Sequence, residues 1–130
     1  MDIQFTDLSE VPLPPAEVRI RSLEVEPYPD GKRLRLTLEL TPFQRPPSGE
    51  IFVSDLLGNQ VAMASIIEAV DAKMQLTLHL RAADPQGEHT ARLIIFYSED
   101  IDTVTEGDQI VAMPARKIVD EKQITFELGD

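Results

Sequence analysis

The sequence predicts an all-β fold, a two-sheet antiparallel Greek-key sandwich of about seven to eight strands. Residues 34–40 alternate leucine with polar residues without interruption, and residues 76–80 repeat this pattern. A period of two places the leucines on one face of a strand and the polar side chains on the other. Such strands belong to antiparallel sheets that cover a core on one side, so two of them indicate a sandwich.

Length and composition indicate one domain at residues 16–130. The chain has 130 residues, 42% of them hydrophobic, which is enough for a core without covalent links. Residues 1–15 are expected to form an irregular or edge segment, because Pro12, Pro14 and Pro15 prevent regular strand pairing. The sequence contains no cysteine, so it forms no disulfide.

The first two strands are expected at residues 17–26 and 32–41, joined by a turn at residues 27–31 that is rich in proline and glycine. The alternation slips at Arg21-Ser22, which predicts a β-bulge there. Pairing Val25 with Leu34 sets the expected register. This register opposes charges in three pairs: Glu24 with Arg35, Glu26 with Arg33 and, beyond the bulge, Arg21 with Glu39.

A second hairpin is expected from residues 50–54 and 61–67, around a turn that contains Gly58-Asn59. Residues 65–72 have helical spacing as well, but we favour a strand followed by a loop. Residues 93–97 are apolar at every position, which predicts a central strand covered on both faces. The remaining strands are expected at residues 73–81, 90–98, 110–113 and 123–128.

Two segments carry a resemblance to known domains. Leu13-Pro14-Pro15-Ala16-Glu17-Val18 resembles the proline-led start of the first strand of immunoglobulin-like and fibronectin type III-like domains, and residues 87–93 resemble the glycine-led start of their sixth strand. The resemblance covers residues 13–128 and implies an immunoglobulin-like sandwich. The sequence departs from these families because it has no tryptophan and because Tyr97 ends a strand instead of standing at a corner. These families have many functions, so the function must be argued from a site.

The net charge of −11 makes nucleic acid an unfavourable partner, because the acidic surface repels a phosphate backbone. We favour the interpretation that the acidic surface only keeps the protein in solution. The alternative is that it attracts a basic partner or drives self-association. No apolar run is long enough to cross a membrane. The N-terminus lacks the pattern of a signal peptide, so we expect a cytoplasmic protein. An exported protein whose signal has been removed is the alternative.

No catalytic motif is present, so we do not expect an enzyme. The sequence has no Gly-x-Ser-x-Gly elbow, phosphate loop or dinucleotide fingerprint. His79 and His89 are expected to be solvated histidines on the surface. Together with a carboxylate they would suit zinc, but their spacing matches no zinc motif.

An acidic segment is where we would look for a metal ion. Oxygen-rich loops at the end of a sandwich suit calcium, although only Asp100-Ile101-Asp102 matches part of a known calcium pattern. A solvated loop is the favoured interpretation. The candidate calcium ligands are Glu99, Asp100, Asp102, Glu106 and Asp108.

The aromatic residues complete the functional hypothesis. Tyr28 and Phe43 lie beside proline-rich turns and are candidates for an interaction patch, whereas the other aromatic rings are expected in the core: Phe5, Phe52, Phe96, Tyr97 and Phe126. We therefore expect a non-catalytic interaction or accessory module that binds a protein partner or associates with itself. The alternative is a calcium- or carbohydrate-binding module that uses residues 99–108.

Overall fold

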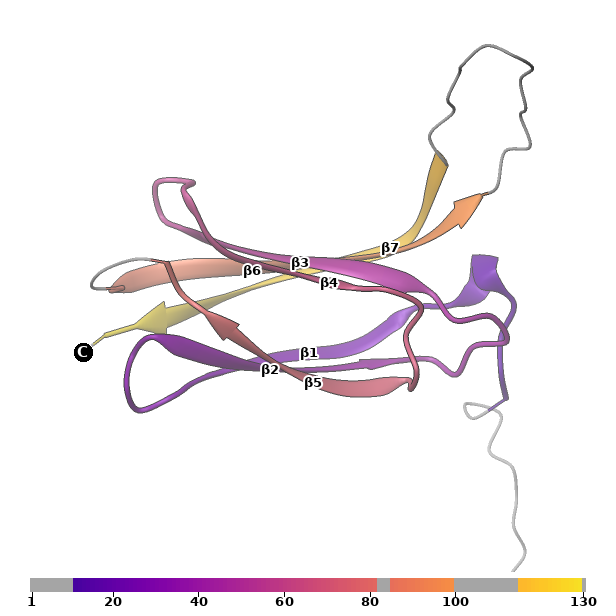
Figure 1. The fold of residues 1–130 in the computed structure, drawn as a ribbon, viewed down its shortest axis with the longest axis horizontal. Helices are drawn as coiled ribbons and strands as arrows, with labels where there is room; N and C mark the ends of the chain where they lie inside the picture. Colours follow the sequence, from indigo (N-terminus) through magenta and orange to yellow (C-terminus); the bar gives the residue numbers. More distant parts are fainter. Residues whose placement is uncertain (1–10, 82–84, 100–114, 130) are drawn as a thin grey trace, which may run out of the picture.

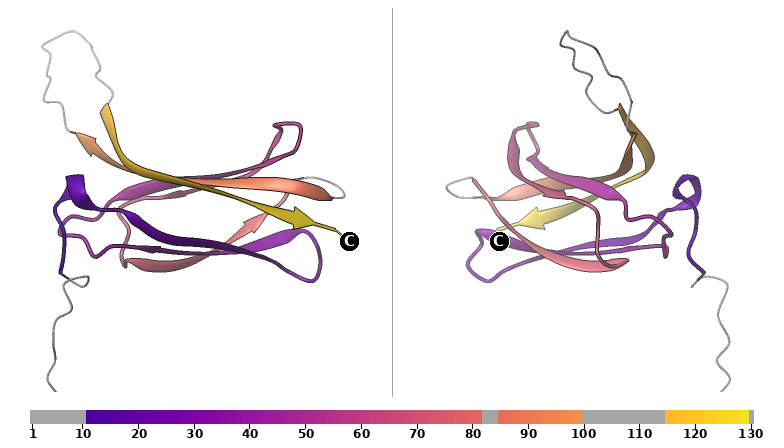
Figure 2. Two further views of the ribbon diagram at one scale, coloured as in Figure 1. Left: turned by 180° about the vertical axis from the view of Figure 1, so that it is seen from behind. Right: turned by 45° about the vertical axis from the view of Figure 1, so that its right-hand side comes forward.

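The computed structural model describes residues 11–81, 85–99 and 115–129. Seven strands in this part of the chain form two antiparallel sheets, which pack face to face (Figures 1 and 2). The order is β1-β2-β5 in one sheet and β4-β3-β6-β7 in the other. This arrangement confirms the predicted all-β sandwich. The strands are β1 (Ile20–Pro27), β2 (Arg33–Leu40), β3 (Ser48–Asp55), β4 (Gln60–Ile66), β5 (Lys73–His79), β6 (Gly87–Glu99) and β7 (Ala115–Leu128), and a 3₁₀ turn, η2 (Pro15–Glu17), precedes them.

Three hairpins and three crossings between the sheets generate the Greek-key topology. β1–β2, β3–β4 and β6–β7 pair as hairpins, whereas the β2–β3, β4–β5 and β5–β6 connections pass from one sheet to the other. Residues 67–72 follow β4 as a loop, as expected. The predicted strand at residues 110–113 lies outside the described residues. No helix in the described ranges is long and apolar enough to span a membrane.

The core lies between the leucine face of β2 and the inner face of β3 and β6. Leu34, Leu36, Leu38 and Leu40 are fully buried, and so are Ile51, Val53 and Leu93 from the opposite sheet. The polar residues between the β2 leucines lie on the outer face, as the alternation predicted. On β5 the same alternation buries Leu78, while Leu76 stays half-buried because β5 is an edge strand.

The hairpin of β1 and β2 has a different register from the predicted one. Val25 pairs with Leu36 rather than Leu34, a shift of two residues that keeps every side chain on its expected face. The cause is a longer turn, in which the Asp30 carboxylate accepts a hydrogen bond from Lys32 N–H at 2.9 Å and pairs with Arg33 Nε at 2.9 Å. The predicted bulge is present between Ile20 and Ser22.

The shifted register changes the charge pairs across this hairpin. Glu26 faces Arg35 at 3.6 Å and Glu24 faces Thr37, so the predicted Glu24–Arg35 and Glu26–Arg33 pairs are wrong. Arg21 and Glu39 do form an ion pair, at 3.5 Å, although Ser22 is the residue in register with Glu39.

β7 begins eight residues earlier than the predicted segment at 123–128. An extra residue of β7, Val119, lies opposite the step from Ile95 to Phe96 and forms a bulge. Beside it, the Asp120 carboxylate accepts a hydrogen bond from Ile20 N–H at 2.8 Å. This bond ties the edge of β1 to β7 and so joins the two sheets along one side.

Replacing Leu36 with alanine will destabilise the fold by about 2–5 kcal/mol, because it leaves a cavity between the sheets. Leu57→Ala is the matched control: Leu57 is 86% exposed in the β3–β4 turn, so its loss will change stability by less than about 0.5 kcal/mol. Urea unfolding followed by circular dichroism measures both. Equal effects of the two substitutions would contradict the assignment of the core.

Candidate functional site

The side chain of Arg116 on β7 crosses the outer face of the four-stranded sheet. Its guanidinium lies 4.2 Å above the ring of Phe96 on β6 and donates to the Glu50 carboxylate of β3, at 2.9 Å from Nη1 and 2.7 Å from Nη2. This hydrogen-bonded pairing lowers the pKa of Glu50 and raises that of Arg116. Phe96 is therefore nearly buried although no further layer of the described residues covers this face.

β6 thus has the central position that the sequence predicted, with β3 on one side and β7 on the other. Its apolar residues on the outer face, Ile94 and Phe96, are 8% and 6% exposed. Phe52 points to the same outer face and is only half-buried, because Ile51 and Val53 on either side of it fill the core. Phe52 is therefore not a core residue, contrary to the prediction.

A second arginine is held at the end of this sheet, in the β2–β3 connection. The Arg45 guanidinium stacks 5.2 Å from the centre of the Tyr97 ring and donates from Nη2 to the carbonyl oxygen of Ser98 at 3.1 Å. The Tyr97 hydroxyl donates in turn to the Arg45 carbonyl oxygen at 2.8 Å, and burial raises the pKa of this tyrosine. Within the described ranges, no carboxylate forms an ion pair with Arg45.

The β4–β5 loop displays two large aliphatic side chains, of which Ile67 lines the same hollow as Arg45. Ile67 is 80% exposed and Val70 is 87% exposed, while Ala69 between them is buried. The loop backbone is held in place by two hydrogen bonds: Ala69 N–H donates to Pro47 O at 2.8 Å, and Glu68 N–H donates to Ser48 Oγ at 3.1 Å. Glu68 has a positive φ of 49°, which is uncommon for a residue with a side chain.

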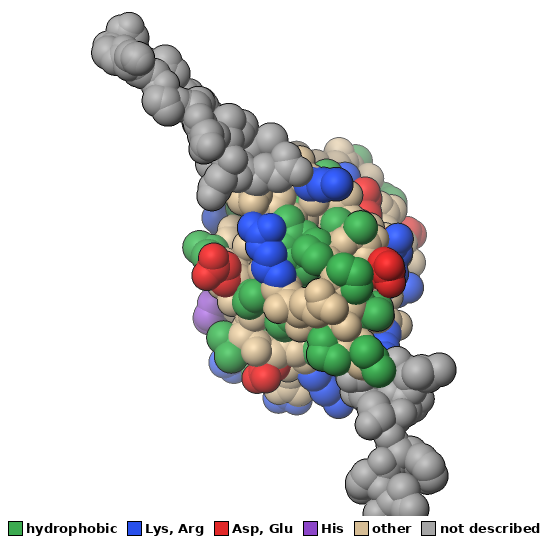
Figure 3. Space-filling model, turned by 90° about the vertical axis from the view of Figure 1, so that its right-hand side faces the viewer, with side chains coloured by type: hydrophobic (Ala, Val, Ile, Leu, Met, Phe, Trp, Pro, Cys, Tyr) green, Lys and Arg blue, Asp and Glu red, His purple; other side chains and the backbone are tan. Residues whose placement is uncertain are grey.

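Two adjoining hollows lie at this end of the sandwich, and Ser48, Ile67 and Ser98 line both of them. The first has a volume of about 230 Å³ and is also lined by Arg45 and Glu68. The second, of about 240 Å³, reaches Arg116 and Phe96. Figure 3 looks onto this end and shows hydrophobic side chains gathered among charged ones. We call Arg45, Pro46, Ile67, Glu68 and Val70 the end surface.

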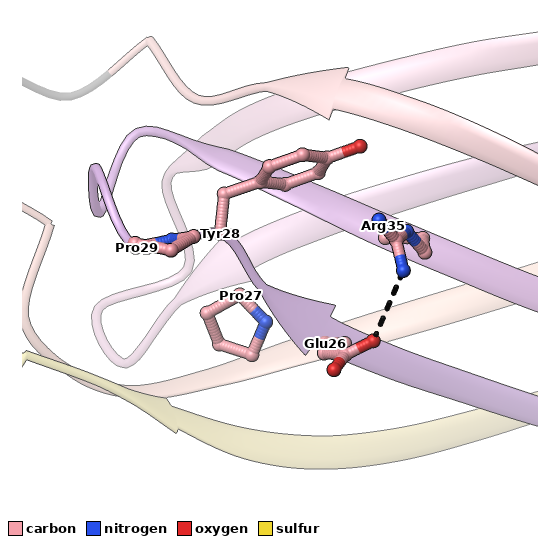
Figure 4. Close-up of a pocket in the computed structure, with 5 residues that line it drawn as sticks. All are labelled: Glu26, Pro27, Tyr28, Pro29 and Arg35. Atoms are coloured by element: carbon pink, nitrogen blue, oxygen red, sulfur yellow. Dashed lines mark ion pairs between the residues drawn. The ribbon is translucent and has the colours of Figure 1, made fainter.

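Tyr28 forms a smaller site on the outer face of the other sheet (Figure 4). Its ring lies under the guanidinium groups of Arg33 and Arg35, at 4.3 and 5.3 Å, and its hydroxyl is 3.2 Å from Thr77 Oγ1. The hydrogen bond with Thr77, followed by the contact with Arg35, lowers the pKa of Tyr28. The hollow beside the ring holds only about 80 Å³, which is below the range of sites for organic ligands.

The two predicted interaction residues lie at opposite ends of the sandwich. Tyr28 is half-buried beside the β1–β2 turn, and Phe43 is packed against the core next to Leu13, with which it forms an isolated bridge. Their role as contact residues stays a prediction. The end surface was not singled out from the sequence. The available signal was a pair of large aliphatic residues, Ile67 and Val70, in a segment expected to be a loop.

The two histidines differ from each other in environment. His79 is exposed on β5, as expected, but His89 is 2% exposed, so the prediction of a solvated His89 is wrong. The His89 ring stacks on Phe126, and its Nδ1 lies 3.0 Å from Gly87 O, which can only accept, so Nδ1 carries the proton. The histidines belong to different sheets, and the described part of the chain holds no cluster of three potential metal ligands.

The candidate calcium ligands fall almost entirely outside the described residues. Glu99 is the last residue of β6, and Asp100, Asp102, Glu106 and Asp108 lie beyond it in the range that is not described. The calcium hypothesis therefore stays a prediction.

Comparison with known proteins gives no family. No family model matches the chain, and no curated protein matches it. Two of the solved structures that it resembles are those of β-glucuronidase from Ruminococcus gnavus, both with a TM-score of 0.43, 13% identity and 85% of this chain covered. The chain spans only 15% and 16% of the length of those two proteins. A likeness at this TM-score and identity carries no functional information.

The two tyrosines of the chain will ionise in separate steps. Tyr28 will lose its proton below the ordinary pKa of 10.0 and Tyr97 above it, because hydrogen bonds and arginines stabilise the first phenolate while burial disfavours the second. Absorbance of phenolate measured against pH will show this. Tyr28→Phe will remove the earlier step and Tyr97→Phe the later one. A single step for both residues would contradict the assignment.

If residues 99–108 bind calcium, the ion will stabilise the folded chain in proportion to its occupancy, by about 2.7 kcal/mol at one hundred times the dissociation constant. Thermal unfolding should then shift upward with calcium and return with a chelator. The variant Asp100→Asn/Asp102→Asn, which keeps the size of both side chains, should lose the shift. A melting temperature that does not respond to calcium removes the hypothesis.

Proposed function

We propose that this protein is a non-catalytic protein-binding module and that it binds through the end surface. The observation that carries the proposal is the exposure of Ile67 and Val70, at 80% and 87%, on a loop whose backbone is hydrogen-bonded to Pro47 and Ser48. Exposed aliphatic side chains with charged residues beside them are typical of protein interaction sites.

The backbone of the loop supports this role. Glu68 has a positive φ, and hydrogen bonds from Glu68 and Ala69 to the β2–β3 segment hold that conformation. Backbone strain persists where the surrounding structure determines it, and it occurs often at functional positions. A loop fixed before binding loses little conformational entropy when a partner arrives, so more of the contact energy appears as affinity.

We further propose that the domain belongs to the wider immunoglobulin-like group, which includes fibronectin type III-like sandwiches. The order β1-β2-β5 and β4-β3-β6-β7 supports this. In constant-type immunoglobulin domains the fourth strand joins the sheet of the first two strands, whereas here β4 pairs with β3 in the other sheet.

A cysteine-free sequence suits a reducing compartment, and we propose the cytoplasm as the location of this protein.

The double variant Ile67→Ser/Val70→Ser will lose partner binding, because it removes the two exposed apolar anchors. Leu56→Ser/Leu57→Ser is the matched control, since these leucines are 73% and 86% exposed in the β3–β4 turn at the opposite end. The wild type and both variants are each immobilised, and the proteins that each one retains are quantified. We expect retention to fall about tenfold or more, equal to about 1.4 kcal/mol, for the first variant only.

Both variants must keep the circular-dichroism spectrum and unfolding midpoint of the wild type, which is expected because the replaced side chains are exposed. Equal retention by all three proteins would contradict the end surface as the binding site. Loss of binding in the Leu56/Leu57 variant instead would move the site to the other end of the sandwich.

A further inference from the structure

We propose that the end surface docks a second copy of this chain, in a two-fold dimer where Arg45 of each copy pairs with Glu68 of the other. This inference rests on the proposed function and names the partner. A two-fold interface uses the same patch on both subunits, so the patch must be complementary to itself. The end surface meets that condition because an exposed cation, Arg45, and an exposed anion, Glu68, line the same hollow as the exposed Ile67.

The charges at this end show which groups still need a partner. Of the two arginines that line the hollows, Arg116 is neutralised by Glu50, with nitrogen–oxygen distances of 2.9 and 2.7 Å. Arg45 instead donates to a backbone carbonyl and stacks on Tyr97, so within the described ranges its charge has no carboxylate partner.

Glu68 is the complementary group. It lines the same hollow as Arg45 and Ile67, yet its carboxylate forms no ion pair with any described residue. Its backbone N–H, by contrast, donates to Ser48 Oγ. A two-fold axis near Ile67 would bring each Arg45 to the Glu68 of the other copy. It would make two ion pairs at once.

The apolar part of the surface supplies the attraction. Ile67 and Val70 from both copies would exclude water from the centre of the contact, and burial of apolar surface contributes roughly 25 cal/mol per Å². Stable dimers bury about 800 Å² on each partner, roughly a tenth of the 8174 Å² surface of this chain. The loop needs no rearrangement to present these side chains, because its backbone is already hydrogen-bonded.

The net charge of −11 does not prevent this contact. All twelve lysines and arginines fall within the described ranges, together with fourteen of the twenty-three acidic residues, so the described body is close to neutral. At physiological ionic strength the Debye length is about 8 Å, and charges farther apart than this are largely screened. The groups at the contact therefore decide the outcome rather than the total charge.

The test is a charge exchange read by sedimentation equilibrium over a series of protein concentrations. Wild type should behave as a dimer. Arg45→Glu and Glu68→Arg should each weaken the dimer tenfold or more, because each change places two like charges at both symmetric contacts. An equal mixture of the two variants should dimerise again, since every contact then joins opposite charges. Lys32→Glu and Glu88→Arg are the matched controls, exposed at the other end of the sandwich, and should leave the dimer unchanged.

Re-association in the mixture also excludes misfolding as the cause of a weakened dimer. The inference is overturned if wild type is monomeric at every concentration, if the dimer persists in both single variants, or if the mixture stays monomeric. The dimer proposal fails and the proposed function stands if the chain is monomeric but the variant Ile67→Ser/Val70→Ser loses binding to a different protein. If that variant changes neither the mass nor the retained proteins, the proposed function fails as well.

Discussion

The apposition of two apolar sheet faces is the constraint on which the rest of this structure depends. β2 contributes a continuous row of leucines, and β3 and β6 contribute the branched residues that face it. Because β2 lies in the middle of its three-stranded sheet, its register decides where β1 and β5 lie. The surfaces available for binding are therefore formed by the side chains and loops that this packing leaves on the outside.

Each sheet also carries a long side chain that crosses its outer face. Tyr28 extends from the end of β1 across β2 to Thr77 on β5, and Arg116 extends from β7 across β6 to Glu50 on β3. Both pair an aromatic ring with a guanidinium group. Such contacts join three strands through side chains alone, and they cover apolar surface over which the described part of the chain places no third layer.

The sequence was sufficient for the layers and for most strand positions, because alternation with a period of two records directly which side chains face the core. It was insufficient for the register of β1 and β2, since the hydrogen bonds of Asp30 lengthen the turn without changing the alternation. It also missed the first half of β7, where charged residues and the bulge at Val119 break the pattern. These are local exceptions within a correctly expected architecture.

The candidate site was less accessible to sequence reasoning. Tyr28 could be singled out because it stands beside a proline-rich turn, but its contact with Thr77, 49 positions away, leaves no mark in the sequence. Arg45 and Ile67 are 22 positions apart and meet only because the β2–β3 and β4–β5 connections end on the same side of the sandwich. Likewise, no pattern separates the buried His89 from the exposed His79, because both stand in alternating segments and only the ring stacking on Phe126 distinguishes them.

The bulge at Val119 has a consequence for how this strand tolerates insertions and deletions. On one side of it, Arg116 and Ile118 point outward at even positions, and on the other side Ile124 and Phe126 point inward at even positions. Because of this one extra residue, the even-numbered side chains of β7 point outward before the bulge and inward after it. Removing Val119 alone would leave Ile118 opposite Phe96 and Asp120 opposite Ile95 in an unbroken ladder, with Arg116 still over Phe96. This one position therefore tolerates a single-residue deletion that would reverse the faces of a strand without a bulge.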